Sequence, residues 1–354
     1  MTQKKGKSKK SKMSKKNWLT VLVVVCVFGL MAVAAFFWAL NNKKVALSEK
    51  FVLYIPTGSN YGQVMDSLCT NHCLEDTAFF SMLARYKKYP QNIRPGRYVI
   101  EPQMSVNALV NKLRSGSQDA QSVTIGKFRT KESLSGRLSK KFEFDSLQML
   151  RALNNDSLMR SLGFNAENAI AIFIPNTYEI YWNTTPEKLL QRMKTEFDNF
   201  WTGSRCKKLE KTGLSRVEAI TLASIVEEET NQNSEKADIA SVYLNRLRKG
   251  MLLQADPTVK FALQDFTLRR ILNKHLQYDS PYNTYIYKGL PPAPICIPSA
   301  ASVDAVLENK STNYYYFCAK EDFSGYHNFA SSVAEHNINA TKFRNALNKR
   351  KIYK

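Results

Sequence analysis

The chain has 354 residues and a net charge of +21 at pH 7, with 44% hydrophobic and 23% charged residues. Ten of the positive charges flank one apolar segment near the N-terminus, which leaves +11 for the rest of the chain. This excess suits an anionic envelope polymer or a lipid surface, and it equally suits plain solubility, so no nucleic-acid partner is predicted. Six cysteines are too few to form a disulfide scaffold in a chain of this length.

The apolar segment predicts a membrane-spanning helix. From Trp18 to Leu40 there is no charged residue, and 23 residues at a rise of about 1.5 Å give a helix of about 35 Å, which spans a bilayer. The basic tail, residues 1–17, holds eight lysines and no acid, so the positive-inside rule places it in the cytoplasm. We therefore expect a single-pass protein of the cell inner membrane whose remaining domains are extracytoplasmic, in the periplasm. The alternative is a signal peptide cleaved after Ala32-Val33-Ala34, but the apolar run is longer than a typical signal peptide.

About 310 residues follow this segment, more than one typical domain, so two domains are expected. Residues 45–120 alternate strand and helix patterns and predict a small α+β module. Its predicted elements are strands at 51–55 and 98–100 and helices at 61–68 and 105–113. Within it, Cys69 and Cys73 are expected either to pair across one helical turn or to remain as buried thiols.

Residues 121–349 are expected to form the larger domain. Their pattern is mostly helical, with short strand candidates at 285–287 and 314–317. The predicted fold class of the whole chain is therefore α+β, with a single N-terminal transmembrane helix, a small module and a mixed α+β domain of catalytic size.

The segment 215–230 holds the most informative acidic residues. Ser215 and Glu218 form a capping-box pattern, so a helix is expected to begin there. At 100° per residue, Glu227 and Glu229 fall on opposite shoulders of its apolar face, where neighbouring aliphatic groups raise the pKa of a carboxyl. Glu228 falls on the opposite side and is expected to be solvated. A raised pKa suits a general acid, and the alternative is an ordinary acidic helix end with surface glutamates.

Three proline-containing segments follow, at 253–259, 280–285 and 289–295. Prolines make such loops rigid, and tyrosine and asparagine side chains stack on sugars and bond their hydroxyl groups. The segments therefore predict a polar groove, with structural turns as the alternative. His327 and His336 match no zinc spacing, so no metal site is predicted.

Several ordered motifs make the sequence resemble a known family. They are 173–178 (FIPNTY), 223–230 (ASIVEEET), 241–247 (SVYLNRL), 254–259 (QADPTV), 282–285 (YNTY), 289–295 (GLPPAPI), 326–329 (YHNF) and 335–337 (EHN). With these motifs the chain resembles the MltG family, the YceG-like endolytic murein transglycosylases, over nearly its whole length. The resemblance implies a LysM-like module at 45–120 and a YceG-like catalytic domain at 121–349.

The same resemblance implies the site residues. The family's catalytic glutamate maps to Glu229, with Glu227 as the fallback. The motifs also supply candidate substrate-binding residues: Asp256, Tyr282, Asn283, Asn176, Tyr178, His327 and His336. Two departures stand out, because Asn176 replaces an aspartate usual in the family, and Gly126-Lys127-Phe128 replaces an expected Pro-Glu-Gly.

The resemblance implies cleavage of the bond between MurNAc and GlcNAc in peptidoglycan glycan strands, with 1,6-anhydro ends as the product. The reaction needs one acid, Glu229, and neither a metal nor another cofactor. It also implies termination of nascent strands beside peptidoglycan synthases. The alternative from another class is a non-catalytic, membrane-anchored glycan-binding scaffold for such synthases, which the basic exported part and the anchor fit equally well.

Overall fold

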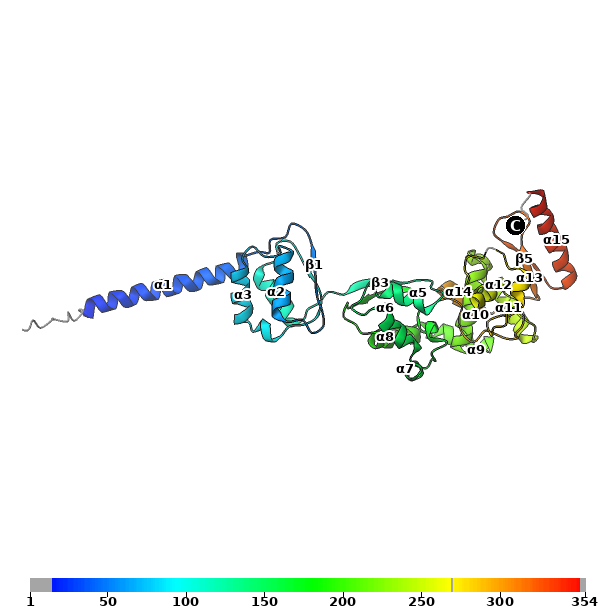
Figure 1. Ribbon diagram of the computed structural model, residues 1–354, viewed down its shortest axis with the longest axis horizontal. Helices are drawn as coiled ribbons and strands as arrows, with labels where there is room; N and C mark the ends of the chain where they lie inside the picture. Colours follow the sequence, from blue (N-terminus) through cyan, green and yellow to red (C-terminus); the bar gives the residue numbers. More distant parts are fainter. Residues whose placement is uncertain (1–14, 269, 351–354) are drawn as a thin grey trace, which may run out of the picture. The chain divides into compact units, whose positions relative to one another are not determined.

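The computed structural model describes residues 15–268 and 270–350. The chain divides into two compact units, one ending at Asp119 and the other beginning at Ala120 (Figure 1). Each unit has a hydrophobic core of its own, so each is described by itself.

Helix α1 (Lys15–Asn42) opens the described part of the chain. Its stretch from Trp18 to Asn42 has a mean hydropathy of 2.8, and none of it is buried within the protein. These 25 residues measure about 38 Å along the axis. By length and composition, the helix is able to cross a membrane. Most of the basic tail lies outside the described residues.

The first unit continues with a small α+β fold (Figure 1). Its elements are β1 (Phe51–Ile55), α2 (Tyr61–Thr70), α3 (Thr77–Tyr86), the 3₁₀ turn η1 (Tyr89–Gln91), β2 (Gly96–Ile100) and α4 (Val106–Ser115). Strands β1 and β2 pair antiparallel, with Phe51 opposite Ile100 and Ile55 opposite Gly96. Apolar side chains of both strands and of the three α-helices that follow β1 fill the core.

Capping fixes the predicted helices of this unit. Asn60 and Gln63 form a reciprocal capping box that begins α2. The Ser105 hydroxyl accepts a hydrogen bond from the third helical amide of α4, and Gly116 ends that helix with φ +73°, a left-handed conformation that favours glycine. Helix α3 is absent from the sequence prediction. Its buried residues Phe79, Phe80, Leu83 and Ala84 have the helical spacing that would have indicated it.

The cysteines of this unit are free thiols in the structure. Cys73 is buried, in agreement with one of the two expectations, whereas Cys69 is exposed. The two therefore form no disulfide here.

The second unit begins with a two-stranded antiparallel sheet and helices packed beside it (Figure 1). Strand β3 (Gln121–Ile125) pairs antiparallel with β4 (Asn176–Ile180). The intervening elements are α5 (Lys131–Leu138), α6 (Ser146–Asn154), α7 (Asp156–Ser161) and the buried turn η2 (Ala169–Ile172), and α8 (Pro186–Phe200) and α9 (Ser204–Thr212) follow β4.

Helix α10 (Arg216–Glu229) lies in the centre of this unit. Elements that follow it are η3 (Asn233–Glu235), α11 (Lys236–Arg248), α12 (Asp256–Leu263), α13 (Asn273–Leu276) and α14 (Ala300–Glu308). All eight residues from Ala219 to Val226 are buried. The expected single apolar face is therefore wrong, because Thr221 and Ser224 on the supposed polar side are covered as well. Helices α11 and α14 both pack against α10.

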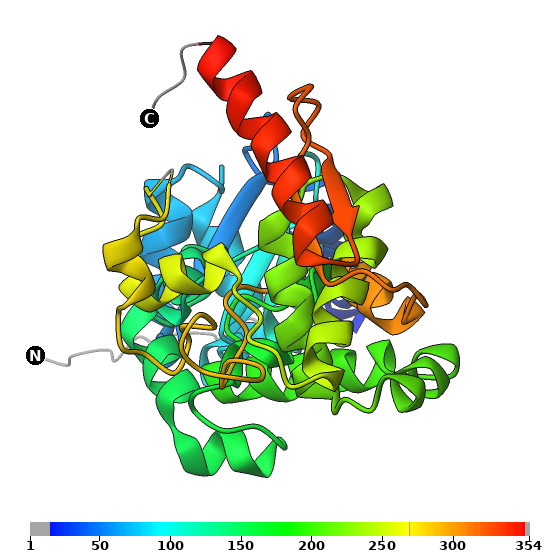
Figure 2. The same ribbon diagram turned by 90° about the vertical axis from the view of Figure 1, so that its right-hand side faces the viewer.

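The C-terminal part of the unit is a hairpin covered by a helix. Strands β5 (Tyr316–Ala319) and β6 (His327–Ala330) pair antiparallel, and α15 (Val333–Lys349) lies along β5 (Figure 2). The strand predicted at 314–317 thus begins later, at Tyr316. The strand predicted at 285–287 is wrong, because the amides of Ile286 and Tyr287 both bond the Asn283 carbonyl oxygen and close a turn.

Candidate active site

Glu229 is the last residue of α10, and its carboxyl is held from the next helix. Oε1 accepts a hydrogen bond of 2.6 Å from the hydroxyl of Tyr243, which lies in α11. Tyr243 is buried and Glu229 is half-buried, and the hydrogen bond fixes the direction of the carboxyl. The capping box of Ser215 and Glu218 begins α10 as predicted.

The surroundings of Glu229 favour its protonated form. Burial is the largest cause and raises the pKa of its carboxyl to about 7. The hydrogen bond from Tyr243 opposes this rise, and the negative charge of Asp256 adds to it. A carboxyl with a pKa near neutrality is suited to donate and then recover a proton.

Glu227 has the opposite environment. Its Oε2 accepts hydrogen bonds from Lys236 Nζ at 3.0 Å and Ser299 Oγ at 2.6 Å, and from the hydroxyl of Ser302. Although burial acts to raise the pKa of this carboxyl, the three donors hold it below its usual value. Glu227 is thus an ionised structural anchor between α10, α11 and α14, and the structure gives no support to its use as a general acid.

Glu228 is not solvated, contrary to the sequence prediction. Its side chain is 12% exposed and receives a bidentate contact from Arg129, at 3.0 Å from Nε and 2.8 Å from Nη2. Lys127 Nζ lies 3.0 Å from Oε1, the oxygen that also accepts from Arg129 Nε. Burial acts to raise the pKa of Glu228, but the two cations hold it below its usual value. The segment after β3, which carries Lys127 and Arg129, covers that side of α10, and a helical wheel of α10 alone does not contain it.

Asp256 begins α12 and lies close enough to Glu229 for its charge to act on that carboxyl. Its Oδ1 accepts a hydrogen bond of 2.6 Å from the Tyr285 hydroxyl. Asp256 is exposed and Tyr285 is half-buried. The structure therefore brings Glu229, Tyr243, Asp256 and Tyr285 into one polar cluster at the end of α10.

Asn283 holds a loop and does not face solvent. It is fully buried, and its side-chain amide donates to the carbonyl oxygens of Leu276 at 3.0 Å and Tyr278 at 2.8 Å. Next to it, the Thr284 hydroxyl lies 2.9 Å from that of Thr258. The loop that carries Tyr285 is thus fastened to the start of α12, and the amide of Asn283 has no capacity left for a sugar.

Tyr282 and the residues of β4 differ in their access to solvent. The Tyr282 ring lies 4.8 Å from that of Phe261, and its hydroxyl donates to Glu167 at 3.4 Å, which leaves it half-buried. Asn176 is exposed at the start of β4. Tyr178 is buried in the core, where its hydroxyl donates to the Ile174 carbonyl oxygen, so it cannot contact a substrate in this structure.

The two histidines lie on the C-terminal hairpin and the helix beside it. The backbone amide of His327 donates to Oε1 of Glu235 at 2.8 Å. The imidazole Nδ1 of His327 lies 3.2 Å from Oε2 of the same carboxyl. His336 lies in α15, with its ring 5.4 Å from that of Tyr316, and burial lowers its pKa. Both histidines are partly covered and join β6 and α15 to their neighbours.

Sequence reasoning assigned no role to Tyr243 or Arg246. Arg246 is buried and donates to the carbonyl oxygens of Tyr315 at 2.6 Å and Leu253 at 2.8 Å, which ties α11 to the residues just before β5 and just before α12. Both residues belong to the 241–247 motif. The available signal was that Tyr243 and Arg246 lie beside the apolar residues Leu244 and Leu247 in this motif, because polar groups buried among apolar ones need partners.

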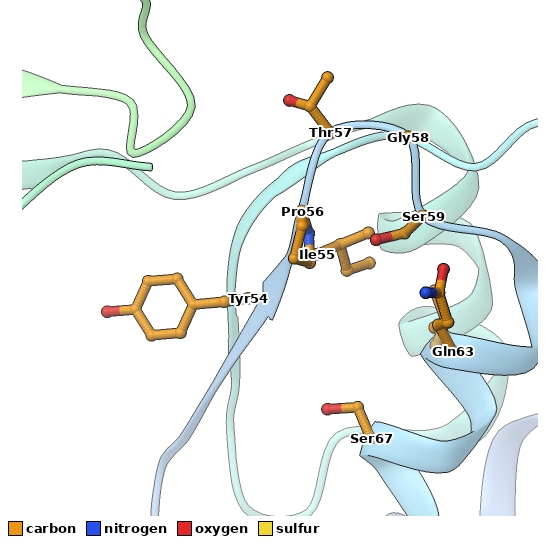
Figure 3. A pocket seen from close by; sticks show the side chains of 9 residues that line it. Tyr54, Ile55, Pro56, Thr57, Gly58, Ser59, Gln63 and Ser67 are labelled. Atoms are coloured by element: carbon orange, nitrogen blue, oxygen red, sulfur yellow. The ribbon is translucent and has the colours of Figure 1, made fainter. Parts of the chain in front are cut away.

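The first unit contains a separate groove of about 370 Å³ between β1 and α2 (Figure 3). The turn from Pro56 to Ser59 forms one wall, and Gln63 and Ser67 of α2 point toward it from the other side. Hydroxyl, amide and backbone groups line this groove together with Tyr54, which is 44% exposed. Such a surface is suited to a polar ligand.

Comparisons with known proteins agree with the family indicated by the motifs. A model of the YceG-like family matches residues 53–342. The endolytic murein transglycosylase of Bacillus subtilis (strain 168) is 27% identical over 312 residues, which cover 84% of this chain and 85% of that protein. The endolytic murein transglycosylase of Streptococcus pneumoniae serotype 2 is 26% identical over 85% of this chain, and the match spans 60% of its length.

A solved structure agrees as well. The crystal structure of a putative yceG-like protein from Listeria monocytogenes has a TM-score of 0.53 and 27% identity, covering 82% of this chain and 99% of that one. Together with the family model, which spans well over half of the sequence, it shows that the chain belongs to the YceG-like family.

Proposed function

We propose that this protein is a peptidoglycan lytic transglycosylase, which cleaves the glycosidic bond between MurNAc and GlcNAc within glycan strands. The observation that carries the proposal is Glu229, whose carboxyl has a pKa of about 7 and is held by Tyr243 beside an exposed acid, Asp256. The names of the relatives in Bacillus subtilis and Streptococcus pneumoniae support the same reaction.

In the proposed mechanism, Glu229 donates its proton to the glycosidic oxygen, and the bond from that oxygen to C1 of MurNAc breaks. The C6 hydroxyl of the same sugar then attacks C1, and its proton passes to the Glu229 carboxylate. The products are a 1,6-anhydro end and a free GlcNAc hydroxyl, and no water is consumed. Because the nucleophile belongs to the substrate, a second catalytic carboxylate, as used by ordinary glycosidases, is unnecessary.

Asp256 has the position to support this chemistry. We propose that its carboxylate stabilises the positive charge that develops at C1 and that Tyr285 fixes its orientation. Tyr282 and Asn176 are half-buried and exposed, so both are able to contact sugar groups. The buried Asn283 and Tyr178 are given positioning roles instead, Asn283 in its loop and Tyr178 in the core of the second unit.

The N-terminal part of the chain suggests where the reaction occurs. We propose that α1 anchors the protein in the cell membrane with the lysine-rich tail inside and the chain after α1 outside, as the positive-inside rule indicates. The small fold of β1, α2, α3, β2 and α4 after it is the proposed LysM-like module, with the groove between β1 and α2 as its glycan contact (Figure 3). A membrane-proximal enzyme would act on nascent strands beside their synthases.

Product analysis tests the proposal. Full-length protein in detergent is incubated with purified sacculi, and the released fragments are examined for 1,6-anhydro ends by mass spectrometry. Glu229→Gln is expected to lower the rate by at least about 100-fold, since it cannot donate the proton. The matched control is Glu210→Gln, an exposed glutamate of α9, which should retain the wild-type rate.

Two outcomes would contradict the proposal. If folded wild-type protein bound sacculi without releasing anhydro ends, the scaffold function would replace the enzymatic one. If Glu229→Gln kept full activity with an unchanged fold, the acid would have to be another residue.

A further inference from the structure

A pocket of about 530 Å³ lies on the second unit, beside the segment that follows β3. It is lined by Lys127, Phe128, Arg129, Thr130, Ser133 and Phe266. The Arg129 guanidinium lies over the Phe266 ring, 5.0 Å from its centre. We call this the cationic pocket, because it combines positive charge with an apolar wall.

The charges of the cationic pocket are only partly neutralised. Glu228 is the one carboxylate that contacts Lys127 and Arg129 among the described residues. Arg129 uses Nε and Nη2 for this contact, and no partner for its Nη1 group is found in the described part of the chain. The side chains of Lys127 and Arg129 are 36% and 41% exposed, so donors of both remain accessible to an incoming anion.

The cationic pocket borders the proposed active site. Arg129 and Phe266 also line a small neighbouring cavity of about 40 Å³, together with Pro257 and Lys260 of α12. The charge of Lys260 in turn acts on the Glu229 carboxyl. The cationic pocket and Glu229 are therefore linked through α12, and the cations of the pocket contact Glu228, the residue before Glu229.

We propose that the cationic pocket binds a carboxylate of the peptide stem carried by the substrate glycan. This inference rests on the proposed function, since it assumes a peptidoglycan strand at Glu229. In peptidoglycan, peptides branch from the lactyl group of MurNAc and carry free carboxylates beside apolar side chains. A carboxylate would accept hydrogen bonds from Lys127 Nζ and Arg129 Nη1, while the aliphatic part of the stem packs on Phe128 and Phe266.

The test compares two substrates in one assay. Full-length protein in detergent cleaves either strands that carry peptide stems or the same strands stripped of stems by an amidase, and kcat/KM is measured for each. We expect wild-type protein to prefer stem-bearing strands and Lys127→Met to reduce this preference about tenfold, the effect of losing one charged contact. Lys127→Arg should restore it, and Lys208→Met, which removes an exposed cation of α9, should keep the wild-type preference.

A third substrate distinguishes a stem carboxylate from a phosphate as the anion that the cationic pocket binds. Stem-bearing strands from which linked phosphate polymers have been removed should show the same dependence on Lys127. Loss of the dependence with this substrate would assign the cationic pocket to a phosphate and overturn the proposal, as would an equal loss of rate on strands with and without stems. If wild-type protein cleaved neither substrate, the proposed function itself would fail, which is a different result.

Discussion

The hydroxyl of Tyr243, in the middle of α11, donates a 2.6 Å hydrogen bond to the carboxyl of Glu229, the last residue of α10. The bond does two things at once. It fixes the direction of the carboxyl, and it stabilises the ionised form, which limits the rise in pKa that burial produces. Four experiments follow from this relationship and from the networks around it.

The first prediction concerns the pH dependence of the wild-type enzyme. Glu229 acts as an acid only while protonated, so the protonated fraction falls as pH rises through its pKa of about 7. We expect kcat/KM to decline on the alkaline side with an apparent pKa near that value. Rates of fragment release between pH 5 and 9 provide the measurement, and a profile that stays flat across this range would remove Glu229 from the role.

The second prediction concerns Tyr243→Phe. Removing the hydroxyl takes away a donor that lowers the pKa of Glu229, so the alkaline limb of the profile should move to higher pH. The rate at pH 6 should fall about tenfold, because the carboxyl loses its fixed direction. A purely structural role of the Tyr243 hydroxyl would lower the rate without moving the alkaline limb. The pH at which the rate declines is therefore the decisive measurement.

The third prediction concerns Asp256→Asn, which should move the alkaline limb of the pH profile to lower pH. The negative charge of Asp256 raises the pKa of Glu229, and its removal therefore lowers it. The amide oxygen of asparagine is still able to accept the hydrogen bond from Tyr285, so the loop should keep its place. A shift of the limb to higher pH in this variant would show that the two carboxyls are not coupled as described.

The fourth prediction concerns stability and the buried pair of Lys236 and Glu227. Their side chains are 5% and 16% exposed, and a buried charge without its partner is costly. We expect Lys236→Met to lower the free energy of unfolding of the second unit by about 3 kcal/mol, measured by urea unfolding followed at the buried Trp201.

Two further variants control this measurement. Adding Glu227→Gln to Lys236→Met should recover part of the loss, because the unpaired charge is then absent. Lys208→Met should change the free energy of unfolding by less than about 0.5 kcal/mol, as is usual for exposed side chains. A loss from Lys236→Met no larger than that of the control would show that the pair does not stabilise the unit.

The sequence by itself determined the parts of this protein that depend on local pattern. The uncharged run from Trp18 to Leu40 fixes a helix long enough to cross a membrane, and the ordered motifs indicated the family. Capping residues such as Ser105 and Ser215 marked helix starts correctly, because a cap is a contact between residues three or four apart.

Tertiary structure alone decided which polar residues face a substrate. Glu227, Glu228 and Glu229 are consecutive in sequence, yet their carboxyls meet Lys236, Arg129 and Tyr243 from different parts of the chain. Their pKa values diverge for that reason, since a carboxyl beside a cation is held ionised and one beside a hydroxyl in a buried setting is not. No helical wheel contains those partners, because they are brought to α10 only by the packing of the whole unit.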